Sequence, residues 1–242
     1  MDKQRMIDAC LALFERNRLP CSREQAEQLF LLTERMLSVN QTMNLTAITD
    51  PDGILLRHYV DSATLSEHVP VGAKLLDVGC GAGFPTIPLG IFRPDLTITA
   101  LDGTAKRIRY VEETCALLGL SQIRAVAGRA EELGQDPVYR ERFDVVTARA
   151  VASMSVLGEL CLGFARVGGQ MIAMKSQHAK EELKAAARCL SLCGGGAPQL
   201  TERELISAEG LTEQRALIIV PKISPTPKNY PRHFSKISKK PL

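Results

Sequence analysis

Residues 74–85 read KLLDVGCGAGFP, and this stretch decides the fold. A short apolar run, Lys74–Val78, is followed by three glycines at alternate positions and then by a helical pattern that starts with proline. This order is typical of a buried strand, a tight turn and a helix N-terminus. Glycines permit positive φ angles and let a ligand lie against bare backbone, while the helix start offers N–H donors. We therefore expect a polar or anionic ligand at this turn.

The spacing of the glycines indicates which ligand the turn binds. A dinucleotide fingerprint, G-x-G-x-x-G, needs a third glycine where the helix packs on the strand. The glycines here are Gly79, Gly81 and Gly83, and Phe84 stands where that third glycine would be. Asp77 before the turn suits an ammonium or sulfonium group better than a pyrophosphate. The D-x-G-x-G-x-G pattern resembles the first motif of class I S-adenosylmethionine-dependent methyltransferases. The alternative is a glycine turn without a ligand.

Length and composition describe an ordinary globular protein. The chain has 242 residues, of which 45% are hydrophobic and 24% charged, enough for one large domain with a helical extension. No apolar run has the length of a membrane span, and the start MDKQRMIDAC lacks a signal-peptide block. Seven cysteines follow neither zinc spacing nor a disulfide framework. We expect a cytoplasmic protein, a monomer, with no metal and no membrane segment.

Charge is unevenly distributed along the chain. Residues 222–242 contain six Lys or Arg and no Asp or Glu, whereas the whole chain carries 30 basic and 27 acidic residues. A basic end is either a solvated, disordered segment or a source of salt-sensitive affinity for a polyanion. On the second interpretation, deleting residues 228–242 would flatten the salt dependence of RNA binding and leave cofactor affinity unchanged.

The periodicity predicts three regions. Residues 1–70 read as a helical cap, with helices over 2–18, over 22–40 and from 51 onward, the second opened by a Ser22–Gln25 capping box. Residues 71–221 alternate strands and helices, and residues 222–242 form the basic tail. Strands are expected at 74–78, 97–102, 123–127, 143–148, 170–174, 199–206 and 216–221. Such alternation predicts an α/β fold with a doubly wound, mostly parallel sheet and an antiparallel end.

Ligands of such sheets bind beyond the carboxyl ends of the strands. Asp102 ends the second strand, where a carboxylate can accept both ribose hydroxyls, although it equally suits a helix N-cap. Ala130 and Glu131 follow the third strand and are placed to meet an adenine edge, although Glu131 also suits the first turn of a helix. Arg149 and Lys175 stand at the fourth and fifth strand ends.

Cations gather at the same rim. Lys106, Arg107 and Arg109 open the helix after Asp102, where they oppose its dipole. Each alone reads as a solvated surface base. Together with Arg149 and Lys175 they favour contact with phosphates.

No catalytic base or nucleophile is indicated. The fourth strand ends in VTARA, without the N-P-P-[FY] motif of enzymes that methylate exocyclic amines or the cysteine of those that methylate pyrimidine carbon five. Cys80, inside the glycine turn, reads as a packing residue. A substrate atom that is already nucleophilic suits such a site, and guanine N7 has a free lone pair at neutral pH. Catalysis would then consist mainly of positioning.

Several longer stretches resemble one family. They are NLTAI at 44–48, Arg57-His58 with Asp61-Ser62, DVGCGAGFPTIPL, LDGTAKRIRYVE, RAEEL, FDVVTARAVASMSVLGELCL and the Met174-Lys175 strand end. They resemble the GidB (glucose-inhibited division protein B) family of bacterial small-subunit ribosomal RNA guanine-N7 methyltransferases over nearly the whole chain. The departures are Gly103, Ser176 and the ending after Arg232, which lacks the expected Gly-Pro-rich sequence.

The resemblance implies a function and a set of site residues. It implies methyl transfer from S-adenosyl-L-methionine to a guanine N7 of 16S ribosomal RNA in a free or assembling small subunit. The resemblance implies cofactor contacts at Gly79, Phe84, Ala130, Glu131 and Arg149. The glycine turn and the strand ends add Gly81, Gly83 and Asp102 to this set. The implied RNA contacts are Lys106, Arg107 and Lys175, to which we add His58 and Arg149. Alternatives are a methyltransferase for another RNA, a protein or a small molecule, a nicotinamide-dependent oxidoreductase, and a non-catalytic RNA-binding protein.

Overall fold

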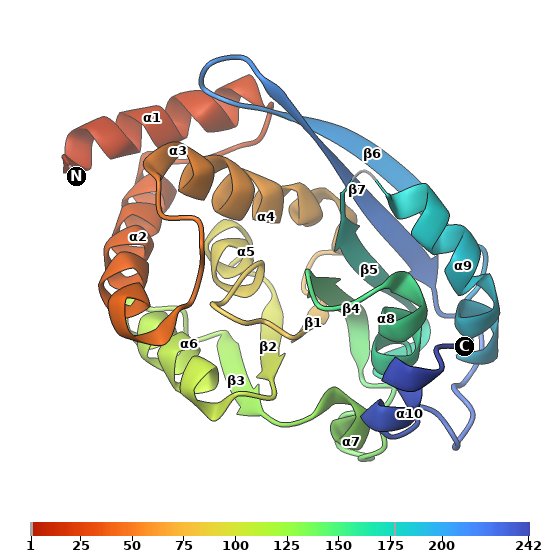
Figure 1. Cartoon of the computed structure of the whole chain (residues 1–242). Coiled ribbons are helices and arrows are strands. Elements are labelled where there is room, and N and C mark those ends of the chain that lie inside the picture. Colours follow the sequence, from red (N-terminus) through yellow and green to blue (C-terminus); the bar gives the residue numbers. More distant parts are fainter. Residues whose placement is uncertain (1, 177) are drawn as a thin grey trace.

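A seven-stranded sheet forms the centre of the computed structural model, which describes residues 2–176 and 178–242 (Figure 1). The strands lie in the order β3-β2-β1-β4-β5-β7-β6. Their bounds are β1 (Lys74–Val78), β2 (Thr97–Asp102), β3 (Ile123–Ala127), β4 (Phe143–Arg149), β5 (Ala165–Lys175), β6 (Gln199–Ile206) and β7 (Thr212–Pro221). Strands β1 to β5 pair in parallel, and β7 runs antiparallel to β5 and β6. The predicted doubly wound sheet with an antiparallel end is confirmed.

The strand order reverses beside β1, which has β2 on one side and β4 on the other. Ligands of open α/β sheets bind at this crevice, outside the carboxyl ends of the strands. The glycine turn after β1 and Arg149 at the end of β4 therefore lie at the expected position for a site.

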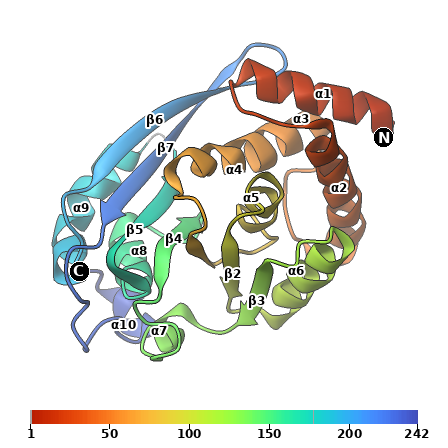
Figure 2. The same cartoon turned by 180° about the vertical axis from the view of Figure 1, so that it is seen from behind.

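Helices cover both faces of the sheet (Figures 1 and 2). Helices α8 and α9 pack together over β4, β5 and β7, and α10 packs on α8. Helices α1, α2, α5 and α6 share an apolar cluster on the other side. The helix bounds are α1 (Lys3–Arg16), α2 (Arg23–Met43), α5 (Thr86–Phe92), α6 (Ala105–Leu117), α7 (Ala130–Leu133), α8 (Met154–Cys161), α9 (Ala179–Leu192) and α10 (Phe234–Lys239). Among the described residues, no helix is long and apolar enough to cross a membrane.

The predicted third helix is a series of short helical pieces. Asp50 caps it by accepting a hydrogen bond from the Gly53 amide at 2.6 Å. The pieces are α3 (Pro51–Gly53), a π-helix (Ile54–Val60), α4 (Asp61–Ala63) and a 3₁₀ turn (Thr64–His68). π-helical turns are rare and often occur at functional sites. Helix α2 contacts the π-helix, because the hydroxyl of Thr33 in α2 lies 2.7 Å from the hydroxyl of Tyr59 in the π-helix.

The C-terminal segment packs on the sheet domain, so its interpretation as a solvated, disordered end is wrong. Lys222 is only 1% exposed and donates to the Leu162 and Cys193 carbonyls. Arg232 pairs with Glu159, whose side chain is fully buried, at 2.6 Å. Two of the six tail cations therefore stabilise the fold. The short helix α10, which the periodicity does not predict, ends the chain.

Candidate active site

The glycine turn adopts the left-handed backbone that its sequence predicts. The φ angles of Gly79, Gly81 and Gly83 are 77°, 55° and 85°. A Cβ on Gly79 would lie 2.6 Å from Val151 Cγ2, and one on Gly83 would lie 2.5 Å from Ile87 Cδ1. At Gly81 the nearest atom is the Gly79 carbonyl oxygen at 3.9 Å, so this side of the turn is open. Two glycines are thus required by packing, whereas Gly81 leaves room for a ligand.

A cavity of about 240 Å³ lies beyond the ends of β1, β2 and β3. Its lining includes Gly79, Asp102, Ala130 and Glu131, as the sequence predicts, and also Phe234 of α10. The Asp102 carboxylate accepts hydrogen bonds from the Gly81 amide at 3.0 Å and the Thr104 amide at 2.8 Å. Because a carboxylate has about four acceptor positions, this orients Asp102 and still leaves capacity for ligand hydroxyls.

Asp77 is fully buried below the glycine turn. Its Oδ2 accepts a hydrogen bond from the Thr86 hydroxyl at 2.6 Å, and its Oδ1 has no hydrogen-bond partner among the described residues. Burial raises the pKa of Asp77 to about 7. An acceptor buried without a partner costs free energy until a donor reaches it. Together with the open space at Gly81, this oxygen fits a ligand that carries an ammonium group.

A second hollow, of about 430 Å³, lies on the other side of the β4 end. His58, Arg149 and Lys175 line it. The His58 ring stacks on Phe84, with centroids 4.3 Å apart and planes inclined by 9°. Ala150, between the two cavities, has a φ of 55°, which is uncommon for a residue other than glycine. Most of its lining is charged or polar, with Ile48, Ala150 and Met174 as the apolar residues, so it suits an aromatic base that also offers hydrogen-bond acceptors.

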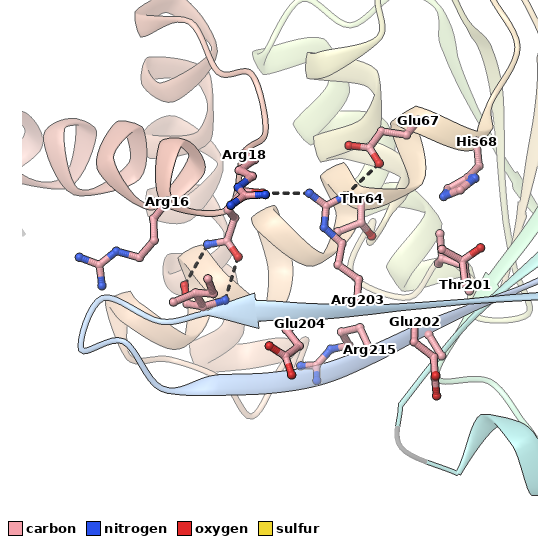
Figure 3. A pocket seen from close by; sticks show the side chains of 14 residues that line it. Arg16, Arg18, Thr64, Glu67, His68, Thr201, Glu202, Arg203, Glu204 and Arg215 are labelled. Atoms are coloured by element: carbon pink, nitrogen blue, oxygen red, sulfur yellow. Dashed lines mark hydrogen bonds and ion pairs between the residues drawn. The ribbon is translucent and has the colours of Figure 1, made fainter.

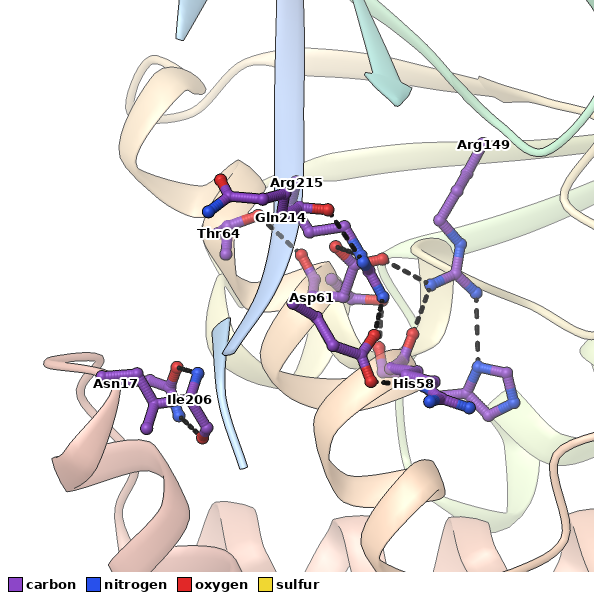
Figure 4. Close-up of polar contacts among 11 residues, drawn as sticks. Asn17, His58, Asp61, Thr64, Arg149, Ile206, Gln214 and Arg215 are labelled. Carbon is purple, nitrogen blue, oxygen red and sulfur yellow. Dashed lines mark hydrogen bonds and ion pairs between the residues drawn. The ribbon is translucent and has the colours of Figure 1, made fainter. Parts of the chain in front are cut away.

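Arg149 is held by the π-helix and by Asp61 (Figure 4). Its Nη1 donates to the Arg57 carbonyl at 2.9 Å and to Asp61 Oδ2 at 3.1 Å. Asp61 also pairs with Arg215 at 3.4 Å. The acid that braces Arg149 is thus Asp61, whereas Glu131 pairs with Arg129 at 3.2 Å. The fork of Arg149 is therefore fixed in the second hollow.

His58 is held in its neutral form. Burial and the Arg149 guanidinium lower its pKa to about 3. Its Nε2 lies 3.0 Å from the Thr46 hydroxyl. At neutral pH this ring is an aromatic surface and a hydrogen-bonding group, and its low pKa makes it a poor general base.

The predicted RNA-binding cations fall into two groups. Lys106 is exposed, and the Arg107 side chain is 44% exposed with its Nη1 3.8 Å from Asp102 Oδ2. Lys175 is 11% exposed and donates to the Ala152 carbonyl and to Glu182, both at 2.7 Å. Lys106 is available to a phosphate, Arg107 lines the first cavity beside Asp102, and Lys175 braces the loop after β4.

A third cavity, of about 460 Å³, lies between the end of α1 and the β6–β7 hairpin (Figure 3). Arg203 donates there to Glu67 at 3.0 Å and to the Asn17 carbonyl at 2.9 Å. Other charged side chains of its lining pair with residues outside the cavity, Glu202 with Lys180 and Arg215 with Asp61. Arg215 lines both this cavity and the second hollow.

Comparison with known proteins places this chain in a family. The family model GidB, described as rRNA small subunit methyltransferase G, matches residues 25–204. The chain belongs to the GidB family. A GidB relative from Lactobacillus delbrueckii subsp. bulgaricus, named ribosomal RNA small subunit methyltransferase G, is 44% identical over 222 residues, covering 90% of this chain and 92% of the relative. The relative of the same name from Moorella thermoacetica is 40% identical over 238 residues, covering 97% and 98%.

A solved structure adds the fold. The S-adenosylmethionine-dependent O-methyltransferase of Thermotoga maritima superposes with a TM-score of 0.53, covering 79% of this chain and 72% of that one. Its 14% sequence identity means that this likeness shows the fold alone. The class I methyltransferase fold and the GidB resemblance predicted from the sequence are both confirmed.

No sequence pattern in this GidB chain indicates a role for Arg215 or Phe234. Arg215 belongs to an edge hairpin in which polar residues are ordinary, so no pattern singles it out. Phe234 follows the tail segment in a short helix without a periodic signal. Asp61 belongs to the polar set that the resemblance contains, but its pairing with Arg149 is visible only in the fold.

Because the site places Asp77 to meet a cationic group, we expect cofactor affinity to depend on pH. A cationic ligand favours the ionised carboxylate, so affinity is expected to fall below about pH 7, by up to about tenfold per pH unit. Because the folded-state pKa is raised, ionisation of Asp77 also lowers the stability of the ligand-free protein as pH rises from about 4 to about 7. Calorimetric titrations with S-adenosylhomocysteine from pH 5.5 to 8.5 measure the first effect. Asp77→Asn should bind weakly at every pH, and a pH slope retained in this variant would contradict the assignment.

Proposed function

We propose that this chain transfers the methyl group of S-adenosylmethionine to N7 of a guanine in small-subunit ribosomal RNA. Membership of the GidB family and the printed names of its relatives support this substrate. The observation that carries the chemistry is the second hollow, where a neutral His58 and a fixed Arg149 flank Phe84 beside the glycine turn. This arrangement holds an aromatic base without offering an efficient general base.

The cofactor supplies a methyl group on a positively charged sulfur. The N7 lone pair forms the new N–CH₃ bond as the S–CH₃ bond breaks, so the positive charge passes to the guanine and S-adenosylhomocysteine leaves. No proton is removed. The protein's contribution is to align base and cofactor and to exclude water.

Each site residue has a role in this proposal. The turn of Gly79, Gly81 and Gly83 carries the methionyl part with Asp77 below it. Asp102 receives the ribose hydroxyls, and Ala130 and Glu131 border the adenine. Phe84, His58 and Arg149 lie between cofactor and base. Lys106 and Arg107 contact phosphates, and Lys175 acts there chiefly by bracing the loop.

At the level of the whole molecule, the enzyme acts as a cytoplasmic monomer, with no metal. The helices of residues 1–70 support the hollow through the π-helix, residues 71–221 form the methyltransferase domain, and residues 222–242 close the molecule. A methyltransferase for another RNA, a protein or a small molecule is the alternative.

Ribosomal RNA from a strain that lacks the protein tests the function. We expect one guanine of the small-subunit RNA to lose a methyl group by mass mapping, and the purified protein to restore it with a tritium-labelled cofactor. Small subunits and deproteinised RNA from that strain, assayed side by side, identify the substrate form. An unchanged methylation map with no transfer to either RNA would favour the alternative.

The rate of methyl transfer at saturating cofactor is expected to change less than about twofold between about pH 6.5 and 9, because no titrating base is needed. The pKa of His58, lowered to about 3, puts its titration well below this range. Single-turnover rates with saturating RNA measure the profile. A rate that falls with a limb near neutrality would point to a proton-transfer step and away from N7.

A further inference from the structure

The C-terminal helix α10 forms one side of the first cavity, next to the loop after β3. Phe234, the first residue of α10, lines this cavity with Arg129 and Leu160. The Arg129 guanidinium carbon lies 5.0 Å from the centre of the Phe234 ring. The ring is 36% exposed and remains accessible from the cavity. An aromatic side chain from the end of the chain is thus part of the cavity wall.

Phe234 is held in place by interactions on both sides. Before it, Arg232 gives Glu159 three hydrogen bonds, from its amide and Nε at 2.8 Å and from Nη2 at 2.6 Å. After it, Ile237 is fully buried in the cluster that contains α8. Arg140 donates to the Thr226 and Tyr230 carbonyls at 2.6 and 2.9 Å. Removing Arg232 would leave the Glu159 carboxylate buried without its partner, which is strongly destabilising. These contacts therefore fix this part of the tail to the methyltransferase domain.

The position of the ring indicates what it contacts. The same cavity contains Asp102, where the ribose belongs, and the loop at Ala130, where the adenine belongs. RNA has a separate hollow beyond Arg149, and Phe234 does not line it. Aromatic rings stack favourably on purine bases whatever their hydrogen-bonding pattern. Arg129, over the same ring, adds a cation–π contact that fixes the ring orientation.

We propose that Phe234 forms an aromatic wall against the adenine of S-adenosylmethionine, so that residues 228–242 complete the cofactor pocket. This inference rests on the proposed function, because it requires that the first cavity binds this cofactor. It replaces the expectation that deleting residues 228–242 leaves cofactor affinity unchanged. Such a deletion removes both Phe234 and Arg232, so the truncated protein binds the cofactor more weakly.

Calorimetry with two ligands tests the contact. S-adenosylhomocysteine carries both halves of the cofactor, and 5′-methylthioadenosine lacks the amino-acid half. Phe234→Ala is expected to weaken both by the same factor, roughly tenfold, because the lost contact is to the shared adenine. Ile223→Ala is the control, since Ile223 is 65% exposed in the same segment and does not line the cavity. It should bind both ligands as the unaltered protein does.

Fluorescence provides a second readout that does not depend on the alanine variant being stable. The chain has no Trp, so Phe234→Trp introduces a single indole. We expect this variant to bind S-adenosylhomocysteine within about threefold of the unaltered protein and its emission to change on binding, because the indole keeps the aromatic face. Ile223→Trp should show no change. Wild-type affinity in Phe234→Ala with unchanged emission in Phe234→Trp would overturn the proposal, whereas an unaltered protein that binds neither ligand would refute the proposed function.

Discussion

Replacing Gly81 by Val is expected to abolish S-adenosylmethionine binding, with a loss of affinity of more than about 100-fold, while the protein stays folded. A Cβ at Gly81 meets no protein atom closer than 3.9 Å, so the new side chain enters open space rather than the core. In the function that we propose, that space receives the methionyl part of the cofactor. Calorimetry with S-adenosylhomocysteine measures the loss, which at this size exceeds about 2.7 kcal/mol of binding free energy.

A matched variant separates this effect from backbone strain. Gly81 has a φ of 55°, at which a β-branched residue is strained. Gly72 has a φ of 69° and no atom within 4 Å of an added Cβ, and it precedes β1 at the opposite end of the strand from the turn. Gly72→Val should therefore lower the melting temperature about as much as Gly81→Val and leave binding intact. If the two variants bind S-adenosylhomocysteine equally well, the assignment of the cofactor to this turn is wrong.

The sheet and the glycine turn could be predicted because their signals are local. The strand bounds of β1, β2 and β3 match the prediction, since each is an apolar run between turn residues. The positive φ angles of the turn follow from its glycines. Strand β5 is longer than predicted because its first half, with Gly168 and Gly169, carries no strand pattern.

The contacts that complete the site depend on pairs that are distant in the sequence. Arg149 is predictable as a strand-end cation, but its partner Asp61 begins α4, directly after the π-helix that α2 contacts. Phe234 reaches the first cavity because Arg232 pairs with Glu159. Neither pair has a sequence pattern, because both result from how the helices pack on the finished sheet.

Arg149→Lys is expected to lower the rate of methyl transfer by about 100-fold and to change RNA affinity by less than about threefold. The guanidinium makes two directed hydrogen bonds from Nη1, lies 5.4 Å over the Phe84 ring and approaches His58 Nδ1 at 3.5 Å. A lysine keeps the charge opposite Asp61 but cannot reproduce this planar fork. Misplacement of the base by about 1 Å at the transferred methyl group is enough for a loss of this size.

Two controls make the result specific to positioning. Lys106→Ala, an exposed cation on α6, should weaken RNA binding, flatten its salt dependence and leave the single-turnover rate at saturating RNA unchanged. Arg215→Lys changes the other partner of Asp61 without touching His58 or Phe84, and we expect its rate to fall less than about tenfold. Cofactor affinity is measured for each variant, so that slower methyl transfer can be distinguished from weaker cofactor binding. If Arg149→Lys keeps most of its activity, Arg149 serves only to brace the π-helix through the Arg57 carbonyl and α4 through Asp61, and the base is oriented by His58 and Phe84 alone.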